Sequence, residues 1–181
     1  PATVGERRRI VANRGLSGID GTIGTAVGAA LGRPHGSRNL ALMGDLTFLH
    51  DQTALVLGPD EPRPDLTIVV PNDDGGAIFS MLEQGAEPYA DRFDTLFGTP
   101  HGVDLAALCA ATRTPYRAWD GELAPPCGLQ VVHARTDRWF VTSPRPAGRT
   151  PWEARPRAEG LRDELERARR RLGEPRLGWL R

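Results

Sequence analysis

Short apolar runs alternate along this chain with segments whose apolar residues recur at helical spacing. The runs 9–12, 40–43 and 66–70 have strand character, and the amphipathic stretches 18–31 and 48–57 lie between them. Each stretch ends at a glycine closely followed by a proline, as helices commonly do. Strands that alternate with helices pair through right-handed crossovers. The pattern therefore predicts an α/β fold, a parallel sheet flanked by helices on both faces.

The second half of the chain continues the alternation and then changes character. A helix is predicted over 103–111, with strands over 116–118 and 129–134. At 181 residues the chain is long enough for one ordinary domain but short for two. We therefore predict one domain over 1–137 and a separate segment over 138–181.

The segment after Asp137 differs in composition from the rest. Residues 143–157 are rich in proline and arginine, and 161–172 form a highly charged helix candidate. Acids alternate with arginines there and aromatic residues are not interleaved. This favours a solvated or docking element over an arm that binds nucleic acid.

Charge and cysteine content argue against several classes of function. The chain has 23 basic and 23 acidic residues, so no overall basic field points to nucleic acid. No apolar run reaches the roughly 20 residues of a membrane span, and no signal peptide is recognisable. Cys109 and Cys127 lack the spacing of a metal site or a disulfide framework. We expect a soluble cytoplasmic protein with reduced thiols, cut from a longer chain because a dense motif follows Pro1 almost at once.

Three loops at the expected carboxyl ends of strands carry the residues capable of chemistry. They are 13–21, 44–47 and 72–76. Ligands of open parallel sheets bind at this edge. Gly44 lets the backbone approach a ligand closely, and Asp45 offers a hard oxygen. The amides of Leu46 and Thr47 open a helix whose positive end suits an anion such as a diphosphate.

The loop 72–76 adds oxygen donors about 27 residues after Asp45. Mg²⁺ prefers octahedral oxygen coordination through one or two carboxylates and substrate phosphates. Asp45, one side chain from Asn72 or Asp73, a loop carbonyl and two phosphate oxygens meet that requirement. Each motif alone is commonly just a turn. Together, at two strand ends, they predict a site shared by a metal ion and a diphosphate.

This pair of motifs resembles the cofactor signature of thiamine-diphosphate enzymes, with Leu46 where a third glycine is usual. The segments 13–21 and 75–80 are similar to those of the 2-succinyl-5-enolpyruvyl-6-hydroxy-3-cyclohexene-1-carboxylate synthases of menaquinone synthesis. The resemblance covers Val11 to Asp137 and is strongest through Ser80. It implies a Rossmann-like, three-layer domain that binds thiamine diphosphate. Helix 161–172 then either restores the family's closing helix or is unrelated sequence.

The resemblance also implies a set of metal ligands. These are Asp45, Asp73 and the carbonyl of Gly75, for Mg²⁺ or Mn²⁺. Measured from Asp45, the loop is one residue longer than usual, so Asn72 stays a competing ligand. An aspartate as the second ligand puts more negative charge on the metal than the amide that many relatives use.

The same resemblance implies the cofactor-binding residues. They are Ser17, Gly18, Ile19, Gly44, Asp45, Leu46, Thr47, Asp73 and Ile78. Leu46 and Thr47 are expected to cradle the diphosphate. Ile19 fits the bulky residue that holds the cofactor bent, although a helix-facing core residue is the alternative interpretation.

Substrate contacts are expected from four residues. Arg14 fits the family arginine that holds a substrate carboxylate in a bidentate contact; a surface arginine is its alternative. Ile78, Phe79 and Leu82 are expected to make an apolar wall beside the reacting carbon, and core packing explains them almost as well. All four histidines are interpreted as structural. They are His35, His50, His101 and His133.

The resemblance implies a carboligase that decarboxylates 2-oxoglutarate and adds the remaining fragment to isochorismate. Its activating glutamate comes from the N-terminal pyrimidine-binding domain of a neighbouring subunit in a homo-oligomer. Nothing in this chain matches that domain, so we expect no catalytic residue here and, for the chain alone, no turnover and weak cofactor binding. Another thiamine-diphosphate enzyme, such as an acetolactate-synthase-like carboligase or decarboxylase, and a non-catalytic assembly domain remain alternatives. A generic Rossmann-type nucleotide binder is disfavoured because no G-x-G-x-x-G follows the first strand.

Overall fold

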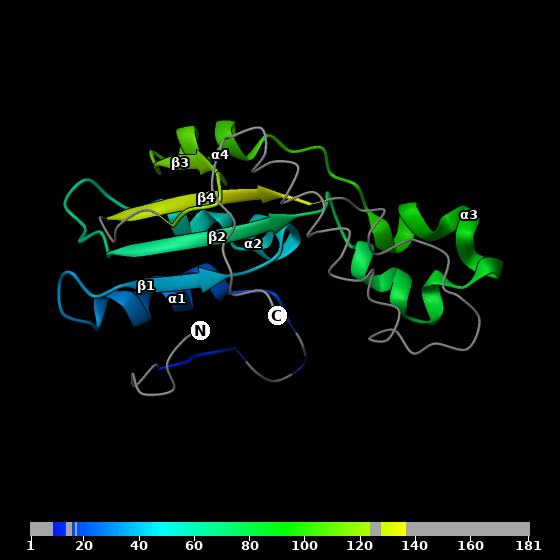
Figure 1. Cartoon of the computed structure of the whole chain (residues 1–181), viewed down its shortest axis with the longest axis horizontal. Helices are drawn as coiled ribbons and strands as arrows, with labels where there is room; N and C mark the ends of the chain where they lie inside the picture. The colour runs from blue at the N-terminus through cyan, green and yellow to red at the C-terminus, as the bar shows by residue number, and fades with distance from the viewer. Residues whose placement is uncertain (1–8, 14–15, 17, 124–127, 137–181) are drawn as a thin grey trace, which may run out of the picture. The chain divides into compact units, whose positions relative to one another are not determined.

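The described part of the chain is built on a four-stranded sheet in the order β1-β2-β4-β3 in which every pair is parallel (Figure 1). The computed structural model describes residues 9–13, 16, 18–123 and 128–136. All elements below belong to one compact unit, Ala12–Thr142. The strands are β1 (Asn39–Leu42), β2 (Leu66–Asn72), β3 (Tyr116–Ala118) and β4 (Leu129–Arg135). The predicted α/β fold with a parallel sheet is confirmed.

Burial along the two central strands places the core on one face of the sheet. Leu66, Ile68 and Val70 of β2 are at most 2% exposed. The register sets Leu66 beside Leu129 and Ile68 beside Val131 of β4, which are equally buried. Since successive side chains of a strand point to opposite faces, these five residues form one apolar surface.

Helices α1 (Thr22–Leu31), α2 (Asp45–His50) and α4 (Leu105–Ala111) cover this surface. Their buried side chains join the strand residues in one core cluster. The helix residues of the cluster are Ile23, Val27, Ala30, Phe48, Leu105 and Cys109. Burial raises the pKa of the free Cys109 thiol to about 11. None of the described helices is long and apolar enough to cross a membrane.

Side chains of the opposite face are unevenly covered. Val132 of β4 is fully buried, whereas Leu40 and Leu42 of β1 are 52% and 75% exposed. The helix predicted over 161–172 and the Pro/Arg-rich stretch 143–157 lie outside the described residues. The predicted domain boundary at residue 137 is therefore untested.

The first predicted helix, 18–31, begins late, at Thr22. Gly21, immediately before it, has a left-handed backbone with φ 65° and cannot continue a right-handed helix. Residues 18–21 consequently remain a loop ahead of α1. Gly18 and Ile19 therefore lie outside the helix, contrary to the prediction.

The second predicted helix, 48–57, was placed too late and made too long. It begins at Asp45, directly after Gly44, and gives way at Asp51 to the 3-10 turn η1 (Gln52–Leu55). The Asp51 carboxylate accepts the Gly24 N–H at 2.9 Å. This bond ties the end of α2 to the first turn of α1.

The predicted strand over 9–12 is wrong. Residues 9–13 have no regular secondary structure, and Ile10 and Val11 are 90% and 55% exposed. A stable strand needs a hydrogen-bonded neighbour and a buried face. Within the described residues β1 pairs with β2, and no strand pairing involves residues 9–13. Apolar character alone did not make this segment a strand.

The later elements follow the sequence pattern closely. The strand over 116–118 is confirmed, and β4 runs one residue beyond its predicted end. The helix predicted over 103–111 begins at Leu105, because Asp104 is its N-cap and accepts N–H bonds from Ala106 and Ala107 at 2.8 and 3.1 Å.

Between β2 and α4 the chain forms a series of short helical turns that the sequence pattern does not predict. We call residues 77–98 the excursion. Its elements are η2 (Ala77–Met81), η3 (Glu83–Gly85), η4 (Glu87–Tyr89), α3 (Ala90–Phe93) and η5 (Asp94–Gly98). Phe97 packs against Phe79 and Phe93 with ring centroids 6.4 Å apart. The excursion thus has a small aromatic cluster of its own.

Two glycines close the base of the excursion. The Gly76 N–H donates to the Gly98 carbonyl at 2.8 Å. Gly75 has φ 129°, and a Cβ on it would lie 2.1 Å from the Gly98 carbonyl oxygen. A Cβ on Gly76 would lie 2.3 Å from the Phe97 carbonyl oxygen. Only residues without a side chain fit both positions.

Substitution in the core should cost far more than the same substitution on the exposed strand edge. Leu55 is fully buried, and Leu42 is 75% exposed. We expect Leu55→Ala to lower the free energy of unfolding by about 2–5 kcal/mol, because a cavity is left in the core. Leu42→Ala is expected to change it by less than about 0.5 kcal/mol. Urea unfolding of the wild type and the two variants checks this. Equal losses of stability in the two variants would contradict the placement of Leu55 in the core.

Candidate functional site

Asp45 is a buried carboxylate at the start of α2, three residues after the end of β1. It begins α2 after Gly44, whose extended backbone (φ −67°, ψ 165°) turns the chain from strand to helix. Only 3% of Asp45 is exposed. A buried charge must be hydrogen-bonded to persist. Its partners therefore show how the site is assembled.

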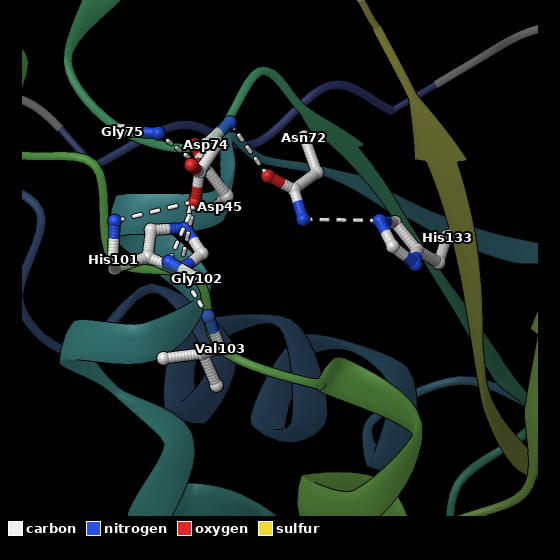
Figure 2. A network of polar contacts seen from close by, with 8 residues as sticks. All are labelled: Asp45, Asn72, Asp74, Gly75, His101, Gly102, Val103 and His133. Carbon is white, nitrogen blue, oxygen red and sulfur yellow. Dashed lines mark hydrogen bonds and ion pairs between the residues drawn. The ribbon is translucent and has the colours of Figure 1, made fainter.

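The loop after β2 supplies the first partner. The Gly75 N–H donates to Asp45 Oδ2 at 2.6 Å (Figure 2). Asn72 Oδ1 accepts the Asp74 N–H at 2.8 Å, and Asp74 has a left-handed backbone with φ 62°. This Asx-type turn swings the Gly75 amide toward Asp45. The expectation that the two acidic loops lie side by side is thus met in the structure.

His101 supplies the second partner of Asp45, and the sequence interpretation missed this contact. Its Nε2 lies 2.9 Å from Asp45 Oδ2, and only 12% of its side chain is exposed. The Val103 N–H donates to Nδ1 at 2.9 Å, so Nδ1 has no proton and Nε2 carries it. His101 therefore donates to Asp45 as a neutral imidazole. No local motif marks this residue, since the chain returns to the site only after the excursion.

Asp74 fixes the backbone that carries His101. Its Oδ1 accepts the N–H groups of His101 and Gly102 at 3.2 and 2.8 Å. Nδ1 of His101 lies 3.5 Å from the same oxygen, but it already accepts the Val103 N–H. Asp74 is thus a structural acceptor that joins the 72–76 loop to the 101–103 loop (Figure 2).

Asn72 is held from the other side by a residue of β4. Its Nδ2 donates to Nε2 of His133 at 3.0 Å, and Nδ1 of His133 lies 2.8 Å from the Tyr116 hydroxyl. Because Asn72 Oδ1 accepts from Asp74, the facing atom is the amide nitrogen, and the proton of His133 sits on Nδ1. Asn72 is 9% exposed with both ends of its amide bonded. These bonds give Asn72 a positioning role within the 72–76 loop, and Asp73 is its partly buried neighbour.

The donors at this edge fit a metal–diphosphate group. Both hydrogen bonds to Asp45 end on Oδ2, and within the described residues Oδ1 has no such bond. Gly44, the N-cap of α2, has no side chain to cap the helix, so among the described residues the first amides of α2 are available to an anion. The described residues contain no group of three His, Cys, Asp or Glu side chains arranged for a metal. Mg²⁺ that shares phosphate oxygens needs only one or two carboxylates.

The remaining predicted residues are less closely joined to Asp45. Ile19 is 37% exposed, and within the described residues no hydrogen bond joins it to the Asp45 network. Ile78, Phe79 and Leu82 are 58%, 38% and 56% exposed, so they are not core residues. Leu46 is partly buried on α2. Gly18 is exposed and Thr47 is partly buried, whereas Arg14 and Ser17 lie outside the described residues.

Acid should weaken the fold through His133. Burial, and then the nearby Arg135 charge, lower the pKa of His133 below its usual value. The unfolded chain, with an ordinary histidine pKa of about 6.5, takes up its proton first as the pH falls. The free energy of unfolding is therefore at its plateau above that pKa and decreases as the pH falls from it toward the lower folded pKa.

Urea unfolding at several pH values from about 8 to 5 tests this sign. His133→Gln is the comparison, because glutamine does not titrate. We expect the wild type to lose more stability than the variant on acidification. Parallel curves for the two proteins would show that His133 does not contribute.

No protein-family model matches the chain. Curated proteins similar to this chain include several named 2-succinyl-5-enolpyruvyl-6-hydroxy-3-cyclohexene-1-carboxylate synthase. The protein of that name from Nocardioides sp. is 67% identical over 138 residues, which cover 72% of this chain and 26% of the relative. Those from Nocardia farcinica and Thermobifida fusca are 58% and 53% identical over 137 residues, with 72% of this chain and 25% and 24% of the relatives covered.

This chain thus spans about a quarter of the length of the curated relatives it matches. The relatives are named as enzymes, and the aligned part is long and highly identical. The resemblance inferred from the sequence motifs is therefore confirmed: over 72% of its length the chain is homologous to one part of the 2-succinyl-5-enolpyruvyl-6-hydroxy-3-cyclohexene-1-carboxylate synthases.

Proposed function

We propose that this chain is the C-terminal, cofactor-binding part of a thiamine-diphosphate-dependent synthase of menaquinone biosynthesis. The names of its relatives support the synthase. The observation that carries the proposal is the buried Asp45 carboxylate held against the 72–76 loop by the Gly75 amide. Two strand ends that meet through a carboxylate form the arrangement that a metal-bound diphosphate requires.

The metal ligands we propose are Asp45, Asp73 and the Gly75 carbonyl, for Mg²⁺ or Mn²⁺. The Leu46 and Thr47 amides, in the uncapped first turn of α2, would hold the diphosphate. Gly75 would thus contribute twice: its carbonyl would bind the metal, and its N–H donates to Asp45. Two carboxylates make this edge strongly attractive to a divalent ion, which in turn balances the charge of a diphosphate.

The apolar surface beside this edge is suited to the reacting part of the substrates. Ile78, Phe79 and Leu82 follow the metal loop directly and expose a third or more of their area. They would exclude water from the reacting carbon, while Arg14 would hold a substrate carboxylate. When bound, thiamine diphosphate supplies the carbanion chemistry for decarboxylating 2-oxoglutarate and joining the product to isochorismate. The protein's part is binding, orientation and electrostatics.

The activating glutamate is proposed to come from the N-terminal pyrimidine-binding domain of a neighbouring subunit. The functional enzyme is then a homo-oligomer, and we place it in the cytoplasm. The chain covers about a quarter of its relatives, which leaves ample sequence for that domain. This chain accordingly contributes one side of a shared cleft.

Neutralising Asp45 should remove metal-dependent cofactor binding. Asp45→Asn keeps the size and one acceptor oxygen but loses the charge. We expect the affinity of the assembled synthase for thiamine diphosphate with Mg²⁺ to fall by roughly two to four orders of magnitude, because losing one partner of a buried charge pair costs about 3–5 kcal/mol. Calorimetric titration measures the change. Asp51→Asn, on the residue just after α2, is the matched control, and equal affinities of the two variants would show that the metal site lies elsewhere.

The 181-residue chain alone is expected to be inactive. It should bind the cofactor weakly and release no detectable carbon dioxide from 2-oxoglutarate, because the activating glutamate and half of the cleft are absent. A carbon dioxide assay with saturating cofactor and Mg²⁺ decides this. Robust decarboxylation would refute the shared cleft, and turnover by the assembled enzyme without isochorismate uptake would favour another thiamine-diphosphate enzyme.

A further inference from the structure

We infer that His101 is a positioning residue that holds the Asp45 carboxylate in its metal-binding orientation. This inference rests on the proposed function and extends it to a residue outside the cofactor motifs. His101 comes from the loop between the excursion and α4, 56 residues after Asp45. Among the described residues, two groups donate hydrogen bonds to the Asp45 side chain. One is the Gly75 backbone amide, and the other is the His101 imidazole, the side-chain donor of the pair.

The first step of the argument is the pattern of bonds on the carboxylate. The Gly75 N–H and His101 Nε2–H both end on Oδ2, at 2.6 and 2.9 Å. Two donors on one oxygen fix the rotation of the carboxylate plane. The other oxygen, Oδ1, is then held in one orientation, ready for a hard cation. With the imidazole removed, one amide alone would leave that plane free to rotate.

The second step is that the loop holds His101 in a single tautomer. The Val103 N–H occupies Nδ1, which places the proton on Nε2. Asp74 Oδ1 anchors the backbone amides of His101 and Gly102. Three backbone amides and one carboxylate thus orient a ring whose Nε2 contacts one acidic side chain, that of Asp45, among the described residues. Simple packing of a histidine would not require such anchoring.

The third step is charge. A neutral imidazole donates a hydrogen bond without adding positive charge beside a cation site, as a lysine or arginine would. Outer-shell donors of this kind orient the ligand, and their loss typically lowers metal affinity by about 10–100-fold. His101 is therefore suited to orient Asp45 without repelling the metal.

Two variants of His101 separate positioning from packing. His101→Leu fills similar space without a donor, and His101→Gln restores an N–H near the position of Nε2. Mn²⁺ affinity of the assembled synthase with thiamine diphosphate, followed by electron paramagnetic resonance, is the main readout. Unfolding midpoints are measured in parallel. His50→Leu, at the exposed end of α2, is the control.

We expect His101→Leu to bind Mn²⁺ about 10–100-fold more weakly, with His101→Gln recovering most of the loss and His50→Leu unchanged. Equal affinity of wild type and His101→Leu would overturn the inference, as would equal losses in the Leu and Gln variants, which indicate packing alone. If the wild type itself binds no Mn²⁺ with thiamine diphosphate, the proposed function fails and the role of His101 fails with it. If the wild type binds Mn²⁺ and His101→Leu binds it equally well, only the inference about His101 fails and the proposed function stands.

Discussion

The hydrogen bond from the Gly75 amide to Asp45 connects the ends of two neighbouring parallel strands, and the rest of the site is arranged around it. Parallel pairing of β1 with β2 brings both strand ends to one edge, which makes the contact possible. Burial makes it necessary, because a carboxylate that is 3% exposed cannot rely on water for its hydrogen bonds. The left-handed Asp74 and the turn at Asn72 aim the Gly75 amide at Asp45.

Around that bond, each polar group is fixed by a partner from a different part of the chain. Asp74 anchors the loop of His101, and His133 on β4 holds Asn72. Tyr116 of β3 then extends the connection to the far edge strand. Buried polar networks are stable only when their members are satisfied together. The site is therefore a cooperative unit that spans all four strands.

The sequence predicts the elements whose signal is local. The compact apolar runs at 40–43 and 66–70 become β1 and β2 almost as bounded, and parallel topology alone places Asp45 near the 72–76 loop. The strand at 9–12 failed because apolar composition does not reveal whether a neighbouring strand is present. His101 could not be found from its surroundings in the sequence. Its role depends on a return path through 77–98, whose short turns have no periodicity to recognise.

The closed base of the excursion separates positions that tolerate a change of loop length from positions that tolerate no side chain. Gly76 bonded to Gly98, with the bare Cα of Gly75 against the same carbonyl, fixes where the chain leaves and rejoins the sheet edge. The chain between these glycines can lengthen away from Ile78, Phe79 and Leu82 at little cost, because longer loops cost little extra closure entropy. A side chain at Gly75 or Gly76, in contrast, would displace the loop whose Gly75 amide bonds Asp45.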